Sequence, residues 1–242
     1  MEAYTAFAGV YDSFMSHIPY EKWADNIHRY LKNNNIGTKI LELGCGTGRF
    51  TLLMEEKGYA MTGIDNSIEM IKSARKKKSK SDFILQDMRA IELEESFDGV
   101  ISVCDSMNYL SEEFDLESVF MGVSGVIKPG GIFIFDLKTE KFYKELGENV
   151  YTDDNEFGSY IWKNSYDEDT RDNYYELTFF IHKKKDLYVK RTEEHVQHVF
   201  LEDEIKKCAE KTGFLIKAVL DESMEVTGNA DSQRIYYILE RK

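Results

Sequence analysis

The chain has 242 residues, of which 42% are apolar and 13% aromatic, and it contains only two prolines. This composition excludes a disordered or fibrous chain and predicts one main globular domain. The 31 basic and 44 acidic side chains give a formal net charge of −13, which repels a phosphate backbone, so we do not expect nucleic acid as a partner.

The three cysteines, Cys45, Cys104 and Cys208, are odd in number and far apart in the sequence. This spacing forms neither a disulfide framework nor a zinc site, so we expect free thiols and no metal ion. The first fifteen residues contain an acid at position 2 and no basic leader, and no segment approaches ~18 consecutive apolar residues. We therefore expect a cytoplasmic protein with no membrane span.

Helix and strand patterns alternate through the first part of the chain. An amphipathic helix is expected at residues 21–33. Short apolar segments predict five strands, at residues 39–44, 60–66, 82–88, 97–104 and 132–137. Helical periodicity predicts the connecting helices, at residues 50–58, 67–80 and 112–127, the second of them with Ser67 as its N-cap. This alternation predicts an α/β fold, a doubly wound parallel sheet with helices on both faces.

The pattern changes after residue 147. Segments rich in tyrosine, phenylalanine and valine alternate as strands do and are separated by polar turns, at residues 159–167, 173–183 and 187–201. A helix at 202–213 and two strands at 214–223 and 234–242 are then expected. We therefore divide the chain into the first part of a core (1–147), an antiparallel β insertion expected to act as a lid (148–200) and the completion of the core sheet (201–242).

The stretch ILELGCGTG, residues 40–48, places Gly44, Gly46 and Gly48 between an apolar strand and a helix. Glycines at such a turn let the backbone approach a ligand closely at the helix N-terminus. The dinucleotide fingerprint requires a glycine three positions after the second one, and Arg49 stands there. The GxGxG spacing therefore disfavours a nicotinamide-dependent dehydrogenase.

LELGCGTG resembles the first motif of the class I S-adenosylmethionine-dependent methyltransferases. Three further segments are similar to motifs of that family and follow in the family order: GIDNS at 63–67, LQDM at 85–88 and IKPGGIFIFD at 127–136. The last two predicted strands fit the family's antiparallel seventh strand. The resemblance implies a Rossmann-like, seven-stranded sheet with an antiparallel last strand and a small antiparallel β insertion, and it implies S-adenosylmethionine as the cofactor.

The resemblance also implies which residues contact the methyl donor. Asp65 would accept hydrogen bonds from the ribose hydroxyls, and Asp87 would accept one from the adenine amino group beside the backbone of Met88; both acids have an alternative role in turns or caps. Glu42 would lie beneath the methionine end, in direct or indirect contact. The expected donor-binding residues are Tyr11, Glu42, Gly44, Cys45, Gly46, Gly48, Asp65, Asn66, Gln86, Asp87, Met88 and Cys104.

Methyl transfer is an in-line displacement that depends on positioning, and it requires a base only where the nucleophile carries a proton. CDSMNYL at 104–110 occupies the position at which the family lines the transfer centre, and it lacks the (D/N/S)-P-P-Y pattern of nucleic-acid enzymes. Cys104 and Asp105 are therefore candidate contacts to the donor and Tyr109 to donor or substrate, with an ordinary strand-end turn as the alternative.

The N-terminal YTAFAGVYDSFM resembles the aromatic lead-in of small-molecule methyltransferases such as the glycine and amino-sugar N-methyltransferases. Tyr11, with Tyr4 behind it, is the candidate for covering the donor, where a ring over the sulfonium makes a cation–π contact. The alternative is that these aromatic residues only attach the segment to the domain.

Strand alternation in the insertion groups large side chains on single faces, which either roof a substrate pocket or pack the lid's own core: Tyr160, Trp162, Asn164 and Tyr166 on one strand, and Tyr175, Leu177, Phe179 and Ile181 on the next. His195 shares a face with Gln197 and is a candidate base or substrate contact, or else part of a solvated strand. His195 and His198 point to opposite sides, which argues against a shared metal ion. The candidate catalytic residues are Tyr11, Tyr109 and His195.

These features together predict a methyltransferase that transfers the methyl group of S-adenosylmethionine to nitrogen or oxygen of a small molecule. An RNA or protein methyltransferase and a non-catalytic S-adenosylmethionine-binding protein are the alternatives. The acceptor's identity and the oligomeric state stay open at this point.

Overall fold

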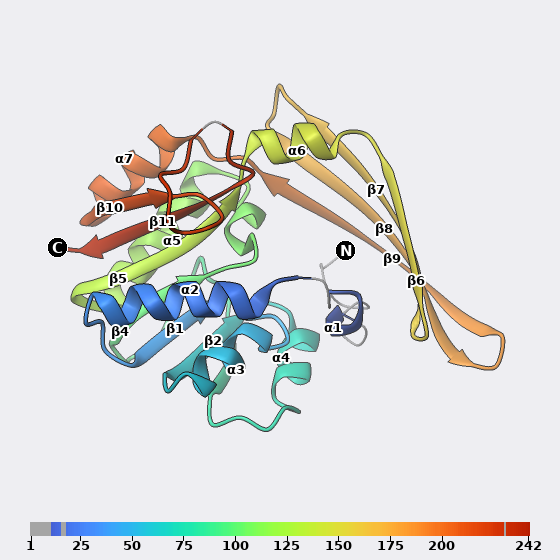
Figure 1. The fold of residues 1–242 in the computed structure, drawn as a ribbon, viewed down its shortest axis with the longest axis horizontal. Coiled ribbons are helices and arrows are strands. Elements are labelled where there is room, and N and C mark those ends of the chain that lie inside the picture. The colour runs from blue at the N-terminus through green and yellow to red at the C-terminus, as the bar shows by residue number, and fades with distance from the viewer. Residues whose placement is uncertain (1–10, 16–17, 230) are drawn as a thin grey trace.

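The computed structural model describes residues 11–15, 18–229 and 231–242. These residues form a seven-stranded sheet of order β10-β11-β5-β4-β1-β2-β3 and a separate four-stranded sheet of order β6-β7-β8-β9 (Figure 1). The predicted fold class is confirmed. No helix in the described part of the chain has the length and hydrophobicity that crossing a membrane requires.

The large sheet is parallel except for one strand. Its strands are β1 (Lys39–Leu43), β2 (Ala60–Asp65), β3 (Asp82–Leu85), β4 (Phe97–Ser102), β5 (Ile127–Lys138), β10 (Phe214–Leu220) and β11 (Arg234–Arg241). β11 pairs antiparallel with both β5 and β10, whereas β1 to β5 pair in parallel. The antiparallel last strand implied by the family resemblance is therefore present.

Helices cover both faces of this sheet. On one face lie α2 (Tyr20–Asn33), α3 (Arg49–Glu56) and α4 (Ile68–Ala74), and on the other lie α5 (Glu113–Val126) and α7 (Glu202–Thr212). α2 is amphipathic because Trp23, Ile27 and Leu31 recur at helical spacing, and all three are buried against the sheet. Each face of the sheet therefore has its own apolar core.

The helix expected at residues 67–80 ends at Ala74. Its N-cap is Ser67, as predicted, and the Ser67 hydroxyl accepts the backbone N–H of Met70. The following segment turns back because the hydroxyls of Ser79 and Ser81 donate to the carboxylate of Glu55 on α3. These tertiary hydrogen bonds replace the helix that the lysine-rich sequence predicted.

The four-stranded sheet comprises β6 (Val150–Asn155), β7 (Gly158–Asp167), β8 (Asp172–Lys184) and β9 (Leu187–His198), and we refer to it as the lid sheet. A short helix, α6 (Glu140–Leu146), connects it to β5. The sequence analysis did not predict α6 or β6. β6 is an edge strand whose sequence VYTDDN is largely exposed and acidic, so it carries no strand-like apolar pattern.

The large side chains of the insertion share one face of the lid sheet. Tyr160 pairs with Phe179 and Trp162 pairs with Leu177, so the two predicted strand faces are neighbours on the same side. Phe14 of the short helix α1 (Tyr11–Phe14) packs against Tyr160, with ring centroids 5.3 Å apart. In Figure 1, α1 lies between the core and the lid sheet. This face of the lid sheet therefore packs against an element from the start of the chain.

Candidate active site

A cavity lies at the carboxyl ends of β1, β2 and β4, where parallel α/β sheets bind their ligands. Ten of its lining residues are candidates from the sequence analysis: Glu42, Gly44, Cys45, Gly46, Asp65, Asn66, Gln86, Met88, Cys104 and Tyr109. The lining also includes seven residues that the sequence analysis did not select: Tyr20, Thr47, Arg49, Phe50, Met70, Val103 and Ser106. Thr47, Arg49 and Phe50 adjoin the glycine motif, and that proximity is the one sequence signal that identifies them.

The glycine turn brings bare backbone to this cavity. Gly46 has φ +54°, and a Cβ added to it would meet nothing within 4 Å, so the space in front of it is open to a ligand. Gly48 differs, because a Cβ there would meet the ring of Phe83 at 2.7 Å. Gly48 does not line the cavity and serves close packing at the N-cap of α3.

Asp65 connects the end of β2 to the glycine turn. One carboxylate oxygen accepts the N–H of Gly46 at 2.8 Å, and the other accepts the N–H of Ser67 at 2.8 Å. Burial raises the pKa of Asp65 despite these two hydrogen bonds. Each carboxylate oxygen has a second lone pair, so Asp65 can still accept hydroxyl donors from a ligand in the cavity.

A chain of hydrogen bonds leads from the cavity into the lid sheet. Tyr109 ends the 3-10 helix η1 (Ser106–Tyr109), and a hydrogen bond of 3.1 Å joins its hydroxyl to Nδ1 of His195 on β9. Nε2 of His195 lies 3.2 Å from the carboxylate of Glu193. An ionised carboxylate only accepts, so we assign the ring proton to Nε2, which leaves Nδ1 to accept from Tyr109.

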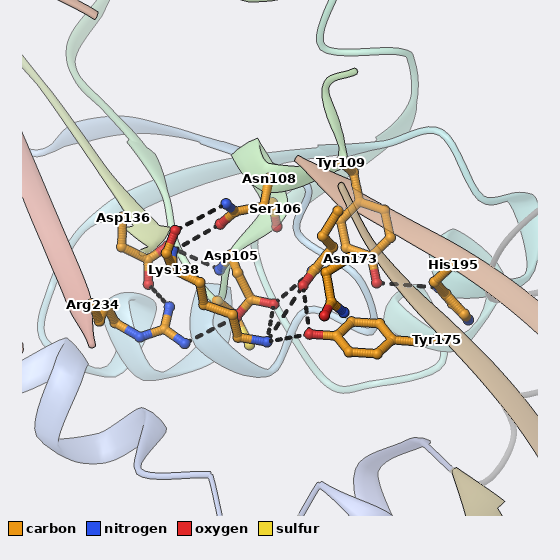
Figure 2. Close-up of polar contacts among 12 residues, drawn as sticks. Asp105, Ser106, Asn108, Tyr109, Asp136, Lys138, Asn173, Tyr175, His195 and Arg234 are labelled. Carbon is orange, nitrogen blue, oxygen red and sulfur yellow. Dashed lines mark hydrogen bonds and ion pairs between the residues drawn. The ribbon is translucent and has the colours of Figure 1, made fainter. Parts of the chain in front are cut away.

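Figure 2 shows Tyr109 and His195 facing each other across the boundary between η1 and the lid sheet. Glu193 and His195 are both buried, so the alternative of a solvated strand for His195 is wrong. The sequence analysis did not select Glu193, although strand alternation places residues 193, 195 and 197 on one face. His198 has a different partner, the carboxylate of Asp172 at 2.7 Å.

Comparison with known proteins decides the family. A family model described as a methyltransferase domain matches residues 40–131. YqeM of Bacillus subtilis (strain 168), a protein named as a methyltransferase, is 34% identical over 239 residues, which cover 97% of this chain and 95% of YqeM. The chain belongs to the class I S-adenosylmethionine-dependent methyltransferases. It is an enzyme whose methyl donor is S-adenosylmethionine.

Solved methyltransferase structures have the same fold along the whole chain. An S-adenosylmethionine-dependent methyltransferase from Clostridium acetobutylicum ATCC 824 superposes with a TM-score of 0.86 at 28% identity, covering 99% of each chain. The sugar N-methyltransferase KedS8 from Streptoalloteichus sp ATCC 53650 superposes with a TM-score of 0.80 at 16% identity, covering 96% of this methyltransferase and 93% of KedS8. The similarity to KedS8 establishes a shared fold that includes the lid sheet.

The residues around the cavity of this methyltransferase fit the donor. The open space at Gly46 suits a ligand pressed against backbone, and Asp65 suits the ribose hydroxyls. The side-chain oxygen of Gln86 is buried and has no hydrogen-bond partner among the described residues, so it suits an amino donor such as that of adenine. S-adenosylmethionine supplies an activated methyl group, a ribose and an adenine but no phosphate, and the lining has donors and acceptors for such a ligand.

Glu42 is a buried acid on the wall of the cavity. Its carboxylate accepts the hydroxyl of Thr51 on α3, and burial raises its pKa to about 8. A nearby cation favours the ionised form of an acid and lowers such a pKa. Glu42 is therefore placed to respond to the positive charge of the donor.

Three predicted donor contacts, among them Gly48, either do not line the cavity or lie outside the described side chains. The carboxylate of Asp87 pairs with Arg89 at 2.7 Å and does not line the cavity. The side chain of Tyr11 and the whole of Tyr4 lie outside the described residues. Contacts of Asp87, Gly48 and Tyr11 with the donor stay predictions.

The segment after Tyr11 is tied to the glycine turn. The Thr47 hydroxyl donates to Asp12 at 2.6 Å, and the ammonium of Lys77 lies 2.7 Å from the other oxygen of Asp12. The guanidinium of Arg49 donates to the carbonyl of Met15 at 3.0 Å. These contacts hold α1 beside the donor cavity, in the region where the aromatic lead-in was expected.

Proposed function

We propose that this methyltransferase acts on a nitrogen or oxygen of a small molecule and that Tyr109 and His195 accept the proton of that group. The observation that carries the proposal is the hydrogen-bonded chain from Tyr109, on the cavity wall, through His195 to Glu193. A buried chain of this kind has a chemical use where the nucleophile carries a proton. Simple donor binding gives it no such use.

The proposed step is in-line. When bound, S-adenosylmethionine would supply an activated methyl group. The acceptor's lone pair would form the new bond to the methyl carbon as the carbon–sulfur bond breaks and leaves its electron pair on sulfur. The proton of the acceptor passes to the Tyr109 oxygen while the Tyr109 proton moves to Nδ1 of His195. The resulting imidazolium is stabilised by the carboxylate of Glu193, the arrangement by which a buried acid supports a histidine base in other enzymes.

Three further observations support a small acceptor. The lid sheet presents a largely aromatic face toward α1, with Tyr160 and Phe179 packed on Phe14. KedS8, which shares the fold, carries the name of a sugar N-methyltransferase. The net charge of −13 opposes a nucleic-acid acceptor.

The three free thiols are compatible with a reducing compartment, and we propose a cytoplasmic enzyme.

The test uses S-adenosylmethionine carrying an isotopically labelled methyl group. The enzyme is incubated with a panel of amines, amino sugars and hydroxy acids and, separately, with the low-molecular-mass filtrate of a cell extract. We expect a labelled small product by mass spectrometry. Label found only in RNA or protein, or donor binding without formation of S-adenosylhomocysteine in either mixture or in whole extract, would overturn the proposal.

A further inference from the structure

A cluster of four charged side chains lies largely buried where η1 meets the large sheet (Figure 2). Asp105 lies 3.0 Å from the ammonium of Lys138 and 3.0 Å from the guanidinium of Arg234. Arg234 also pairs with Asp136, which accepts the backbone N–H of Asp105 at 2.9 Å. Burial alone would raise the pKa of Asp105, but the charges of Lys138 and Arg234 hold it below its usual range. Asp105 is therefore an ionised acid held by β5 and β11.

The lid sheet reaches the same acid through Gln197 of β9. The Gln197 amide nitrogen donates to Asp105 at 2.8 Å. Its oxygen accepts the hydroxyl of Tyr143 at 2.9 Å and that of Tyr175 at 3.0 Å. An amide provides the donor and the acceptor that these partners require, whereas a carboxylate or an apolar side chain does not.

The acid that this cluster holds is part of an unusual turn. Cys104 has φ +63° and Asp105 has φ +56°, so two consecutive residues other than glycine occupy the left-handed region. Such backbone persists only where surrounding contacts determine it, and it concentrates at functional sites. Cys104 is part of this turn and Tyr109 follows it in η1, and both line the donor cavity.

The cluster is not explained by stability alone. Removing charges from water is unfavourable, and apolar side chains of the same volume often stabilise a core equally well. A fully hydrogen-bonded polar network does fix one geometry. Asn108 extends the network, because its amide donates to the carbonyl of His198 on β9 at 2.8 Å and its oxygen accepts the N–H of Lys138 at 2.9 Å.

We propose that Asp105 and Gln197 are positioning residues through which the lid sheet holds the turn at 104–105, and with it Tyr109, in the geometry for transfer. The contact between them connects β9 to η1, so a displaced lid sheet releases the turn. Whether the lid sheet holds the turn does not depend on which acceptor is methylated. Only the expected effect of the turn on turnover rests on the proposed function.

The first experiment measures the turn without any acceptor. Iodoacetamide alkylation of Cys104 is followed by mass spectrometry in the full chain, with Cys208 on α7 as the internal reference. In Gln197→Leu we expect the Cys104 rate, relative to Cys208, to rise by roughly tenfold or more, because losing a buried hydrogen bond to a charged group favours the open turn to about that degree. Lys163→Gln, which breaks the exposed pair with Glu176 on the same sheet, is the control and should leave the ratio unchanged.

Gln197→Glu supplies a second variant that keeps the shape of the side chain. The groups facing it are Asp105, Lys138, Tyr143 and Tyr175, and Arg234 pairs with Asp105 behind them. When the introduced acid is ionised it repels Asp105, and when it is protonated it donates as the amide does. We therefore expect the Cys104 ratio to approach that of the wild type as the pH falls, whereas Gln197→Leu stays high at every pH.

Turnover is the second readout. With the low-molecular-mass filtrate as acceptor, kcat should fall in Gln197→Leu and recover at lower pH in Gln197→Glu, while donor affinity stays near that of the wild type. An unchanged Cys104 ratio in both variants would overturn the inference whatever the acceptor. A raised ratio with unchanged kcat would overturn the positioning role of the turn. If the Cys104 ratio rises in the variants but neither the variants nor the wild type turn over an acceptor, the result counts against the proposed function instead.

Discussion

The two walls of the active site are built differently. We call the glycine turn with Asp65 the donor wall, and Asp105, Tyr109, His195 and Gln197 the transfer wall. The donor wall uses contiguous backbone and short-range contacts, such as the hydrogen bond from Gly46 to Asp65, 19 residues apart. The transfer wall uses side chains from distant elements, because Asp105 meets Gln197 92 residues later and Arg234 129 residues later. The residues of the donor wall are therefore close together in the sequence, whereas those of the transfer wall come together only when the chain folds. This difference lets the acceptor side change while donor binding is kept.

The largest effect on donor affinity is expected at the donor wall. Gly46→Val should lower donor affinity by more than ~100-fold, because the positive φ strains a branched residue by ~1–3 kcal/mol and the side chain fills the space of the ligand. Isothermal titration calorimetry with S-adenosylhomocysteine measures the loss. Gly58→Val is the matched control, since Gly58 has φ +96° and open space but does not line the cavity. Normal affinity in Gly46→Val would refute the placement of the donor.

The transfer wall should affect rate and not donor binding. His195→Asn should lower kcat by ~10²–10⁴-fold, the usual contribution of a general base, with donor affinity unchanged. The measurement is S-adenosylhomocysteine formation with the low-molecular-mass filtrate as methyl acceptor. His182→Asn, in an exposed histidine near the β8–β9 hairpin, is the control. Equal kcat in wild type and His195→Asn would refute the proposed proton transfer through His195.

A smaller effect separates two acids of the donor wall. Asp65→Ala should weaken donor binding by at least ~10-fold, because hydrogen bonds to a charged group contribute ~1.5–3 kcal/mol. Asp87→Ala should weaken donor binding less than Asp65→Ala does, because the Asp87 carboxylate already pairs with Arg89. Calorimetry on both variants measures the difference. An equal loss in the two variants would show that Asp87 reaches the adenine, as the family resemblance implies.

The smallest effect is a pH dependence of donor binding. The pKa of Glu42 is about 8 because of burial, so near pH 7 the acid is largely protonated in the donor-free protein. A cationic donor favours the carboxylate, so binding should release protons near pH 7 and strengthen a few-fold as the pH rises toward 8. Calorimetry in buffers of different ionisation enthalpy counts these protons. The same count in Glu42→Gln would assign the protons to another group.

The donor wall was predictable because its signals lie in short segments. Ten of the fourteen residues expected to bind the donor or to act in catalysis line one cavity, and the glycine spacing identified the turn correctly. Asp87 and Gly48 were selected by the same motifs but do not line the cavity, because Arg89 and Phe83 are their tertiary neighbours. A sequence motif indicates which residues are near a site. The tertiary neighbours of each side chain then determine whether it faces the site.

The transfer wall was predictable only in part. Strand alternation correctly placed His195 and Gln197 on one face, and the loop position identified Tyr109. Glu193, Lys138 and Arg234 were not selected from the sequence. The pairing of β9 with β8 and of β11 with β5 brings them into the interior or to its edge. A short sequence segment does not predict contacts between strands that are so far apart in the chain.

The most direct test of the account is a crystal structure of the full chain with S-adenosylhomocysteine bound. We predict that the adenosyl ribose lies at Asp65, that the ligand runs along the backbone of Gly46, and that its sulfur faces the hydroxyl of Tyr109, with Tyr109 still hydrogen-bonded to His195. A ligand in the cavity whose sulfur points away from Tyr109, or one bound outside the glycine turn, would contradict it.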